Sequence, residues 1–160
     1  MSLLPKSMQL QLSKPAPQDF SQKKVLKQEL YSRVSFRSEN YIASIAPSRD
    51  VLLQNEKFDT IVCLGVSKFI QLNFGDQGIN ALFLKAFHQL ESSGTFILGP
   101  QQWSSYKGDK GLCPLFREMV TKVIALKPGL YLRYLTRIGF IHERTLESKE
   151  HGLVYILKKP

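Results

Sequence analysis

The segment "FDTIVCLGVSKFIQLNFGDQG", residues 58–78, decides the fold class. Its first half holds a continuous apolar run from Ile61 to Leu64, which is typical of a strand covered on both faces of a parallel sheet. Directly after this strand come polar and basic side chains, among them Lys68. In open α/β sheets, ligands bind beyond the carboxyl ends of the strands, so we expect this polar segment to face a ligand crevice.

The flanking segments predict the other elements of such a fold. After Asp76, which can cap a helix, apolar residues recur at three- and four-residue spacing and "SSG" ends the pattern; "TFILG" (95–99) then predicts a second buried strand. We expect a helical segment around 114–126, and a short helix after Pro128 and Gly129 with Leu130, Tyr134 and Leu135 packed inward. "FIHERTL" and "LVYILKK" predict an antiparallel pair of terminal strands. This order indicates an α/β sheet with flanking helices.

The N-terminal region is organised differently. Prolines at positions 5, 15 and 17 break any regular element, so residues 1–20 are predicted to be an irregular basic arm. Residues 20–34 could form a short helix that begins at Ser21, and the stretch around Val34 and Phe36 reads as extended.

Composition limits the possible functions. A chain of 160 residues with 43% hydrophobic and 22% charged residues is expected to form one globular domain rather than a disordered, fibrous or membrane protein. No secretory signal is recognisable, which leaves the cytosol or the nucleus. Cys63 and Cys113 have neither a zinc spacing nor a disulfide pattern, so we expect two reduced, buried thiols and no metal.

The charge balance points to a polyanionic partner. Lys and Arg number 22 against 13 Asp and Glu, which gives a net charge of +9 and a pI near 9.6. Nucleic acid is the leading candidate. The alternative is a solvated basic arm that only aids solubility.

Four motifs in this order carry a family resemblance: "ENYIAS", "FDTIVCLGVSKFIQLNFGDQG", "GPQQWSSY" and "ALKPGLYLRYLTRIGF". They resemble the corresponding motifs of the methylphosphate capping enzymes of small nuclear RNA, the bicoid-interacting type of RNA methyltransferase. The resemblance implies a class I (Rossmann-like) methyltransferase fold, here its C-terminal half, with residues 21–160 as the methyltransferase-like domain. It also implies transfer of a methyl group from S-adenosylmethionine to the 5′-terminal γ-phosphate of an RNA.

The same resemblance assigns candidate site residues. Asn40 and Tyr41 would lie near the adenine of the cofactor, and Leu64 near its methionine end. Lys68 would approach the triphosphate as the catalytic residue. The pocket for the RNA end would be formed by Gln101, Trp103 and Tyr106. The implied partners are RNA with a 5′ triphosphate and ribonucleoprotein proteins, without a membrane, and the nucleus is favoured over the cytoplasm.

The residues leave other interpretations open. Lys68 could be a solvated lysine, Asp76 is more readily a helix cap than a catalytic acid, Trp103 could be a lid over the core, and Asn40 could support a turn. The first 39 residues contain no glycine, so the Gly-rich turn that approaches the cofactor in class I methyltransferases is absent there. Three functions therefore remain: an RNA phosphate methyltransferase, a non-catalytic RNA-binding or ribonucleoprotein-assembly module, and a truncated isoform of a capping enzyme.

Overall fold

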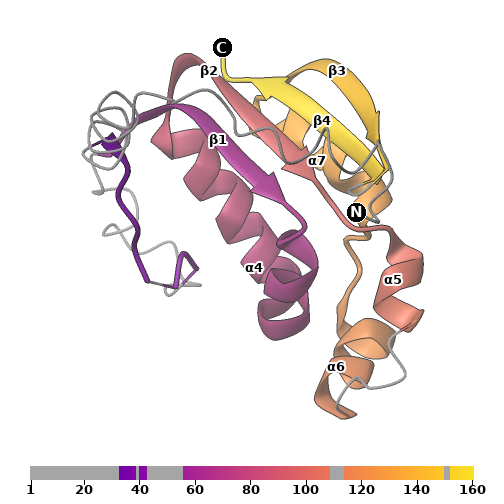
Figure 1. The fold of residues 1–160 in the computed structure, drawn as a ribbon. Helices are drawn as coiled ribbons and strands as arrows, with labels where there is room; N and C mark the ends of the chain where they lie inside the picture. The colour runs from indigo at the N-terminus through magenta and orange to yellow at the C-terminus, as the bar shows by residue number, and fades with distance from the viewer. Residues whose placement is uncertain (1–32, 39, 43–55, 109–113, 150–151) are drawn as a thin grey trace, which may run out of the picture. The chain divides into compact units, whose positions relative to one another are not determined.

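Among the described residues of 40–160, four strands form a mixed sheet (Figure 1), in the order β1-β2-β4-β3. β1 (Phe58–Leu64) and β2 (Leu90–Gly99) run parallel, with Leu64 level with Gly99. β4 (Gly152–Lys158) pairs antiparallel with β2 and also with β3 (Ile141–Ser148). The predicted parallel strands and the antiparallel terminal pair are therefore confirmed.

The computed structural model describes residues 33–38, 40–42, 56–108, 114–149 and 152–160. The predicted arm (1–20), nearly all of the predicted helix at 20–34, and Cys113 lie outside these residues. Residues 1–39 and 40–160 form two separate units. In the first unit, residues 34–38 are exposed. The sequence predicted an extended segment around Val34 and Phe36, and these residues are not part of a strand.

Two helices, α4 (Ser67–Gln89) and α7 (Tyr131–Ile138), pack on one face of the sheet. Their buried residues meet Cys63, Leu98 and Tyr155, which lie side by side on neighbouring strands. Phe83 of α4 contacts Phe96 and Tyr131 edge to face, with ring centroids 6.4 and 5.2 Å apart. This interlocked apolar and aromatic layer is the main core.

The expectation that β1 is covered on both faces is wrong for the described structure. Val62, whose side chain points to the face opposite α4, is 58% exposed. β1 is an edge strand among the described elements, because it pairs with β2 alone. The continuous apolar run thus predicted a strand correctly, but not what covers its second face.

The polar segment after β1 is helical, although the sequence predicted a helix only after Asp76. α4 begins at Ser67 rather than after Asp76, and the helix direction changes at Gly75, whose φ of 62° and ψ of −158° are not helical. One other boundary and one burial prediction also differ. β2 begins at Leu90, before the "SSG" expected to precede it, and Leu130 is 46% exposed, whereas Tyr131 is fully buried.

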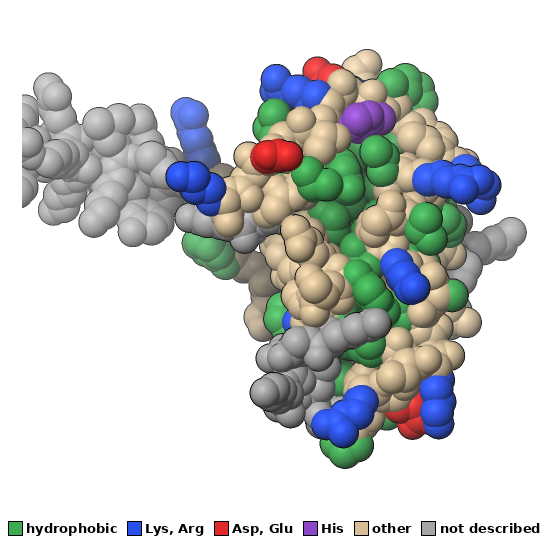
Figure 2. All heavy atoms as spheres, turned by 90° about the vertical axis from the view of Figure 1, so that its right-hand side faces the viewer, with side chains coloured by type: hydrophobic (Ala, Val, Ile, Leu, Met, Phe, Trp, Pro, Cys, Tyr) green, Lys and Arg blue, Asp and Glu red, His purple; other side chains and the backbone are tan. Residues whose placement is uncertain are grey.

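Shorter helical segments connect β2 to α7. They are α5 (Trp103–Gly108), α6 (Pro114–Glu118), the π-helical turn η2 (Met119–Val123) and the 3₁₀ turn η3 (Pro128–Leu130). α5 and α6 lie beyond the carboxyl ends of β1 and β2 (Figure 1), which is where the crevice was expected. Figure 2 views the side of β3 and α6, where hydrophobic side chains form a band and most charged side chains are Lys or Arg.

Candidate functional site

Gln101 joins the two turns that follow β1 and β2. Its Oε1 accepts hydrogen bonds from the backbone N–H of Lys68 (3.2 Å) and from Ser67 Oγ (3.4 Å), while its Nε2 donates to the carbonyl of Gly65. Gly65 also donates its N–H to the carbonyl of Gly99 over 3.0 Å. Its φ of +69° is a conformation that glycine adopts readily, so a tight turn can bring Ser67 and Lys68 back toward the β2 loop.

Lys68 lies between the first turn of α4 and α5. Its Nζ donates to the carbonyl of Ser105 at 2.8 Å and lies 5.8 Å from the centroid of the Tyr106 ring. The residue is only 8% exposed. Lys68 is therefore not a solvated surface lysine, because its ammonium group is held beneath the backbone of α5.

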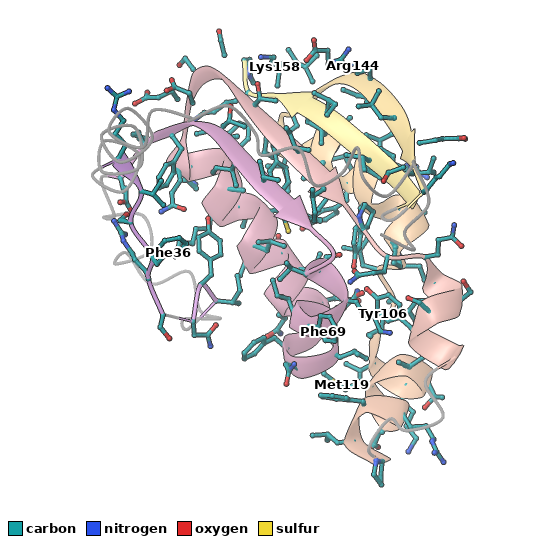
Figure 3. All side chains as sticks on the ribbon, viewed as in Figure 1. Phe36, Phe69, Tyr106, Met119, Arg144 and Lys158 are labelled. Carbon is teal, nitrogen blue, oxygen red and sulfur yellow. The ribbon has the colours of Figure 1, made fainter. Side chains whose placement is uncertain are left out.

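Trp103 and Tyr106 belong to a second apolar cluster with Leu72 and Ile124. Their rings lie 4.9 Å apart, and Lys127 Nζ is 5.7 Å from the centroid of Trp103. Figure 3 shows Tyr106 in the space between α5 and the first turns of α4. Tyr106 has no exposed surface, so a base could stack on its ring only if α5 moved.

Asn40 and Tyr41 lie at a separate place, beside the second half of α4. Asn40 Oδ1 accepts a hydrogen bond from the N–H of Ile42 (3.0 Å), which is the turn-supporting role foreseen as the alternative. The Tyr41 hydroxyl donates to Gln89 Oε1 at 2.5 Å, and Lys85 Nζ lies 4.0 Å from the centre of its ring. These contacts hold Tyr41 against α4.

A largely apolar cavity of about 370 Å³ opens between Tyr41, β1 and α4. Its walls include Cys63, Val66 and Ile70, with Gln89 and Thr60 as polar neighbours. Burial raises the pKa of the Cys63 thiol to about 11, so this wall is uncharged at neutral pH. Cys63 is a free, buried thiol as predicted. Leu64, half-buried at the end of β1, does not line this cavity.

A second, polar cavity of about 610 Å³ lies beyond the carboxyl ends of β1 and β2. We call it the β-end cavity. Its lining residues are Gly65, Gly99, Gln101, Gln102, Ser104, Ser105, Lys149 and Gly152. Of the residues predicted for the RNA pocket, Gln101 lines it directly, and Trp103 precedes two of its serines.

Sequence reasoning missed part of this cavity. The backbone carbonyl of Ser105 accepts a hydrogen bond from the Lys68 ammonium. Lys149 follows β3, and Gly152 is the first residue of β4. Lys149 and Gly152 lie outside the four motifs of the family resemblance. They approach the β2 loop only because β4 pairs with β2. A prediction of these residues from the sequence would therefore require the strand order to be known.

Gln71 and Asp76, the other polar residues after β1, have a structural role. Gln71 is fully buried; its Nε2 donates to Asp76 Oδ1 (2.8 Å) and to the carbonyl of Leu126 (2.7 Å), and its Oε1 accepts from the Tyr131 hydroxyl (2.7 Å). Asp76 Oδ2 accepts the N–H groups of Ala125 (2.8 Å) and Leu126 (2.9 Å). Asp76 therefore anchors the segment before Pro128 to α4.

Two classes of feature are absent from the described part of the chain. It contains no group of three or more His, Cys, Asp and Glu side chains arranged to hold a metal ion. It also has no helix with the length and apolar character needed to cross a bilayer.

Sequence comparisons connect this arrangement with known proteins. A protein of Arabidopsis thaliana named "Probable RNA methyltransferase" is 35% identical over 126 residues, which cover 78% of this chain and 36% of that protein. The Drosophila melanogaster U6 snRNA methylphosphate capping enzyme is 34% identical over 74% of this chain, and the human 7SK snRNA methylphosphate capping enzyme is 34% identical over 68%. The chain spans 39% and 16% of these two relatives, so it corresponds to a part of each.

A structural comparison and a family match complete the assignment. The N-methyltransferase NodS of Bradyrhizobium japonicum superposes on 82% of this chain with a TM-score of 0.52 at 11% identity, over 65% of its own length. The fold is therefore that of a class I methyltransferase sheet with flanking helices, of which four strands are described. The sequence model of the Bicoid-interacting protein 3 family matches residues 58–156. The chain belongs to the Bicoid-interacting protein 3 family.

Proposed function

We propose that this chain acts in S-adenosylmethionine-dependent methylation of the 5′-terminal phosphate of a small nuclear or other non-coding RNA. The observation that carries the proposal is the joining of Lys68 to Gln101 at the carboxyl ends of β1 and β2, in a chain of this family. Both residues were assigned to the RNA end by resemblance. Their shared position beside a polar cavity supports a common role.

The chemistry suits the residues at this position. A phosphate oxygen is anionic at neutral pH, so its attack on a sulfonium methyl group requires orientation and charge control rather than a general base. The Lys68 ammonium supplies positive charge under α5, and the Gln101 amide holds the Lys68 backbone in place. Trp103 stays a predicted stacking surface for an unpaired RNA base. Tyr106 would support Trp103 from the buried side.

The described residues fit one end of the cofactor. The apolar cavity has walls suited to an adenine ring, with Tyr41 and Gln89 at its rim. Leu64 and Gly65, at the end of β1, would lie toward the methionine end. Ribose hydroxyls are commonly held by an acidic side chain, and none of the described residues lining the apolar cavity is acidic. When bound, S-adenosylmethionine would supply the activated methyl group.

The remaining assignments follow from the same proposal. RNA with a 5′ triphosphate would be the substrate, ribonucleoprotein proteins the associated partners, and the nucleus the site of action. The net charge of +9 supports binding to RNA. Residues 21–160 as one methyltransferase-like domain after a basic arm at 1–20 stay a prediction.

A second candidate is an RNA-binding module without catalysis. The observation that favours it is the lack of an acidic side chain among the described residues of the apolar cavity, since this removes the usual partner of the cofactor ribose. Such a module would keep the β-end cavity and bind RNA without transferring a methyl group.

Calorimetric titration with S-adenosylhomocysteine separates the two candidates. Binding at a one-to-one ratio, followed by methyl transfer to a 5′-triphosphate RNA but not to the same RNA with a 5′ hydroxyl, is the result expected for the methyltransferase. A folded sample that binds the RNA yet gives no heat with S-adenosylhomocysteine would support the RNA-binding module instead.

The role of Lys68 has its own test. Lys68→Ala is expected to weaken binding of 5′-triphosphate RNA by about tenfold, and of 5′-hydroxyl RNA by clearly less, because the lost charge acts on the terminal phosphates. Fluorescence anisotropy with both RNAs measures the difference, and circular dichroism checks that the variant folds. Equal weakening of both RNAs would show that Lys68 does not read the 5′ end.

A further inference from the structure

The β-end cavity has two walls from distant parts of the sequence. One wall is the β1–α4 turn, where Gln101 donates to Gly65. The other is formed by Lys149 and Gly152, and a Cβ atom added at Gly152 would lie 3.8 Å from Gln102 Nε2. The β2–α5 loop supplies two adjacent amide side chains, Gln101 and Gln102, to the lining of the same cavity.

The polar groups around the cavity suit an anion. Gly152 has a φ of +68° and, like Gly65 and Gly99, carries no side chain, so a ligand can approach the backbone closely. The amides of Gln101 and Gln102 add hydrogen-bond donors. None of the described lining residues is acidic. A volume of about 610 Å³ is in the range of cavities that hold a nucleotide-sized ligand.

The charge of the cavity comes from Lys149. It is the one charged side chain among the described lining residues, and it is exposed. Lys68, in contrast, is buried, donates a hydrogen bond to the carbonyl of the lining residue Ser105, and is not itself among the described lining residues. Position in the fold, rather than any motif, therefore singles out Lys149.

We propose that Lys149 binds a phosphate group of RNA in the β-end cavity, which Gln101 also lines. The inference rests on the proposed function for its ligand, but it names a residue and a wall that the family motifs do not include. Lysine acts on phosphate as a compact cation, and one such contact gives an affinity that depends on salt. A 5′-terminal phosphate and an internal phosphodiester share this chemistry, and the two RNAs below distinguish them.

The test compares Lys149→Ala, Lys149→Arg and a matched control. Lys57→Ala removes the same charge at the opposite end of β1, where Lys57 Nζ donates to the carbonyl of His88 at 2.5 Å. Anisotropy titrations would use one single-stranded RNA sequence with a 5′ triphosphate or a 5′ hydroxyl, over a range of salt concentrations. Thermal unfolding would confirm that every variant is folded.

The expected result is specific to Lys149. Lys149→Ala should weaken RNA binding by about fivefold to tenfold and lower the slope of log K against log salt by about 0.7. Lys149→Arg should keep most of the affinity, and Lys57→Ala should match the unaltered chain. Weakening confined to 5′-triphosphate RNA would assign Lys149 to the terminal phosphates, and equal weakening of both RNAs would assign it to an internal phosphodiester.

Failure of this inference is distinct from failure of the proposed function. If the unaltered chain binds RNA and Lys149→Ala behaves as Lys57→Ala does, Lys149 has no role although the function stands. If the unaltered chain binds neither RNA, the function fails, and the cavity is then tested with inorganic tripolyphosphate. Trp103, the only tryptophan, adjoins two lining serines and reports binding by fluorescence. A titration that Lys149→Ala leaves unchanged, or no signal at all, would overturn the inference.

Discussion

At the scale of single residues, the polar segment after β1 separates into two functions. Lys68 and Ser67 turn toward the β2 loop and Gln101, whereas Gln71 and Asp76 turn toward the chain before α7. Helical spacing alone would place Gln71 on the same face of α4 as Ser67 and Lys68. The division therefore follows from the segments beside successive turns of α4, which are the β2 loop at Lys68 and the chain before α7 at Gln71. The candidate site thus lies directly beside a buried hydrogen-bond network.

Gln71 should be the most sensitive position of that network. Gln71→Met removes one buried acceptor and two donors, and so leaves the Tyr131 hydroxyl, the Leu126 carbonyl and one Asp76 oxygen without their partner. We expect the free energy of unfolding to fall by about 2–4 kcal/mol, measured by urea denaturation. Asn73→Ala, which alters an exposed amide on the same helix, should change it by less than about 0.5 kcal/mol. Similar losses for both variants would contradict the network.

At the scale of the element, the change of direction in α4 allows one segment to serve two purposes. The turns before Gly75 bring Ser67 and Lys68 to the carboxyl ends of the strands, and the turns after it bury Ile79 and Phe83 against the sheet. The φ of 62° and ψ of −158° at Gly75 lie in a region that other residues rarely adopt. Glycine at this position therefore makes the change of direction possible.

Gly75→Ala tests this explanation. An added Cβ would meet Val123 and Met119 only at 3.5 and 3.6 Å, so the strain would come from the backbone rather than from steric overlap. We expect a loss of about 1–3 kcal/mol in the free energy of unfolding, and weaker RNA binding if the first turns of α4 shift. Gly129→Ala is the matched control, because nothing lies within 4 Å of its added Cβ. A Gly75 variant as stable as the Gly129 variant would show that α4 does not need this conformation.

At the scale of the whole molecule, burial in the described core raises the pKa of the Cys63 thiol and of the Tyr106 and Tyr131 hydroxyls. The pKa of Cys63 rises to about 11 and that of Tyr106 to about 12. Each group holds its proton more tightly in the folded chain than in the unfolded chain. Their contribution to stability is therefore complete below the unfolded pKa values and is lost as the pH rises through the folded ones.

This predicts a loss of stability in alkaline solution. Between pH 8 and pH 10 the unfolded chain should release the Cys63 proton while the folded chain keeps it, which lowers the free energy of unfolding by up to about 1.4 kcal/mol per pH unit above 9. Chemical denaturation at several pH values measures the slope. Cys63→Ala should be less stable at every pH but lose less between pH 8 and pH 10. An unchanged slope in that variant would show that Cys63 does not contribute.

The sequence by itself determined the class of fold, and it placed the candidate site at the ends of strands. Apolar runs specify β1 and β2, the terminal strands follow from their own patterns, and Lys68 and Gln101 were both assigned to the ends of strands. The strands and the positions of Lys68 and Gln101 at strand ends can be predicted because they depend on local periodicity and on short motifs, both of which are visible in the sequence. The free, buried thiol of Cys63 was predicted for the same reason.

Only the tertiary structure decided which polar residues meet. Gln71 and Asp76 both bind the backbone of Leu126, which lies 55 and 50 positions later in the sequence. Tyr106 is buried rather than accessible to a ligand, and Lys149 lines the β-end cavity. These arrangements arise from strand order and from the change of direction at Gly75, which bring together segments that share no local pattern. The exposure of Val62 has the same origin, because an apolar run specifies a strand, whereas its neighbours in space determine what covers it.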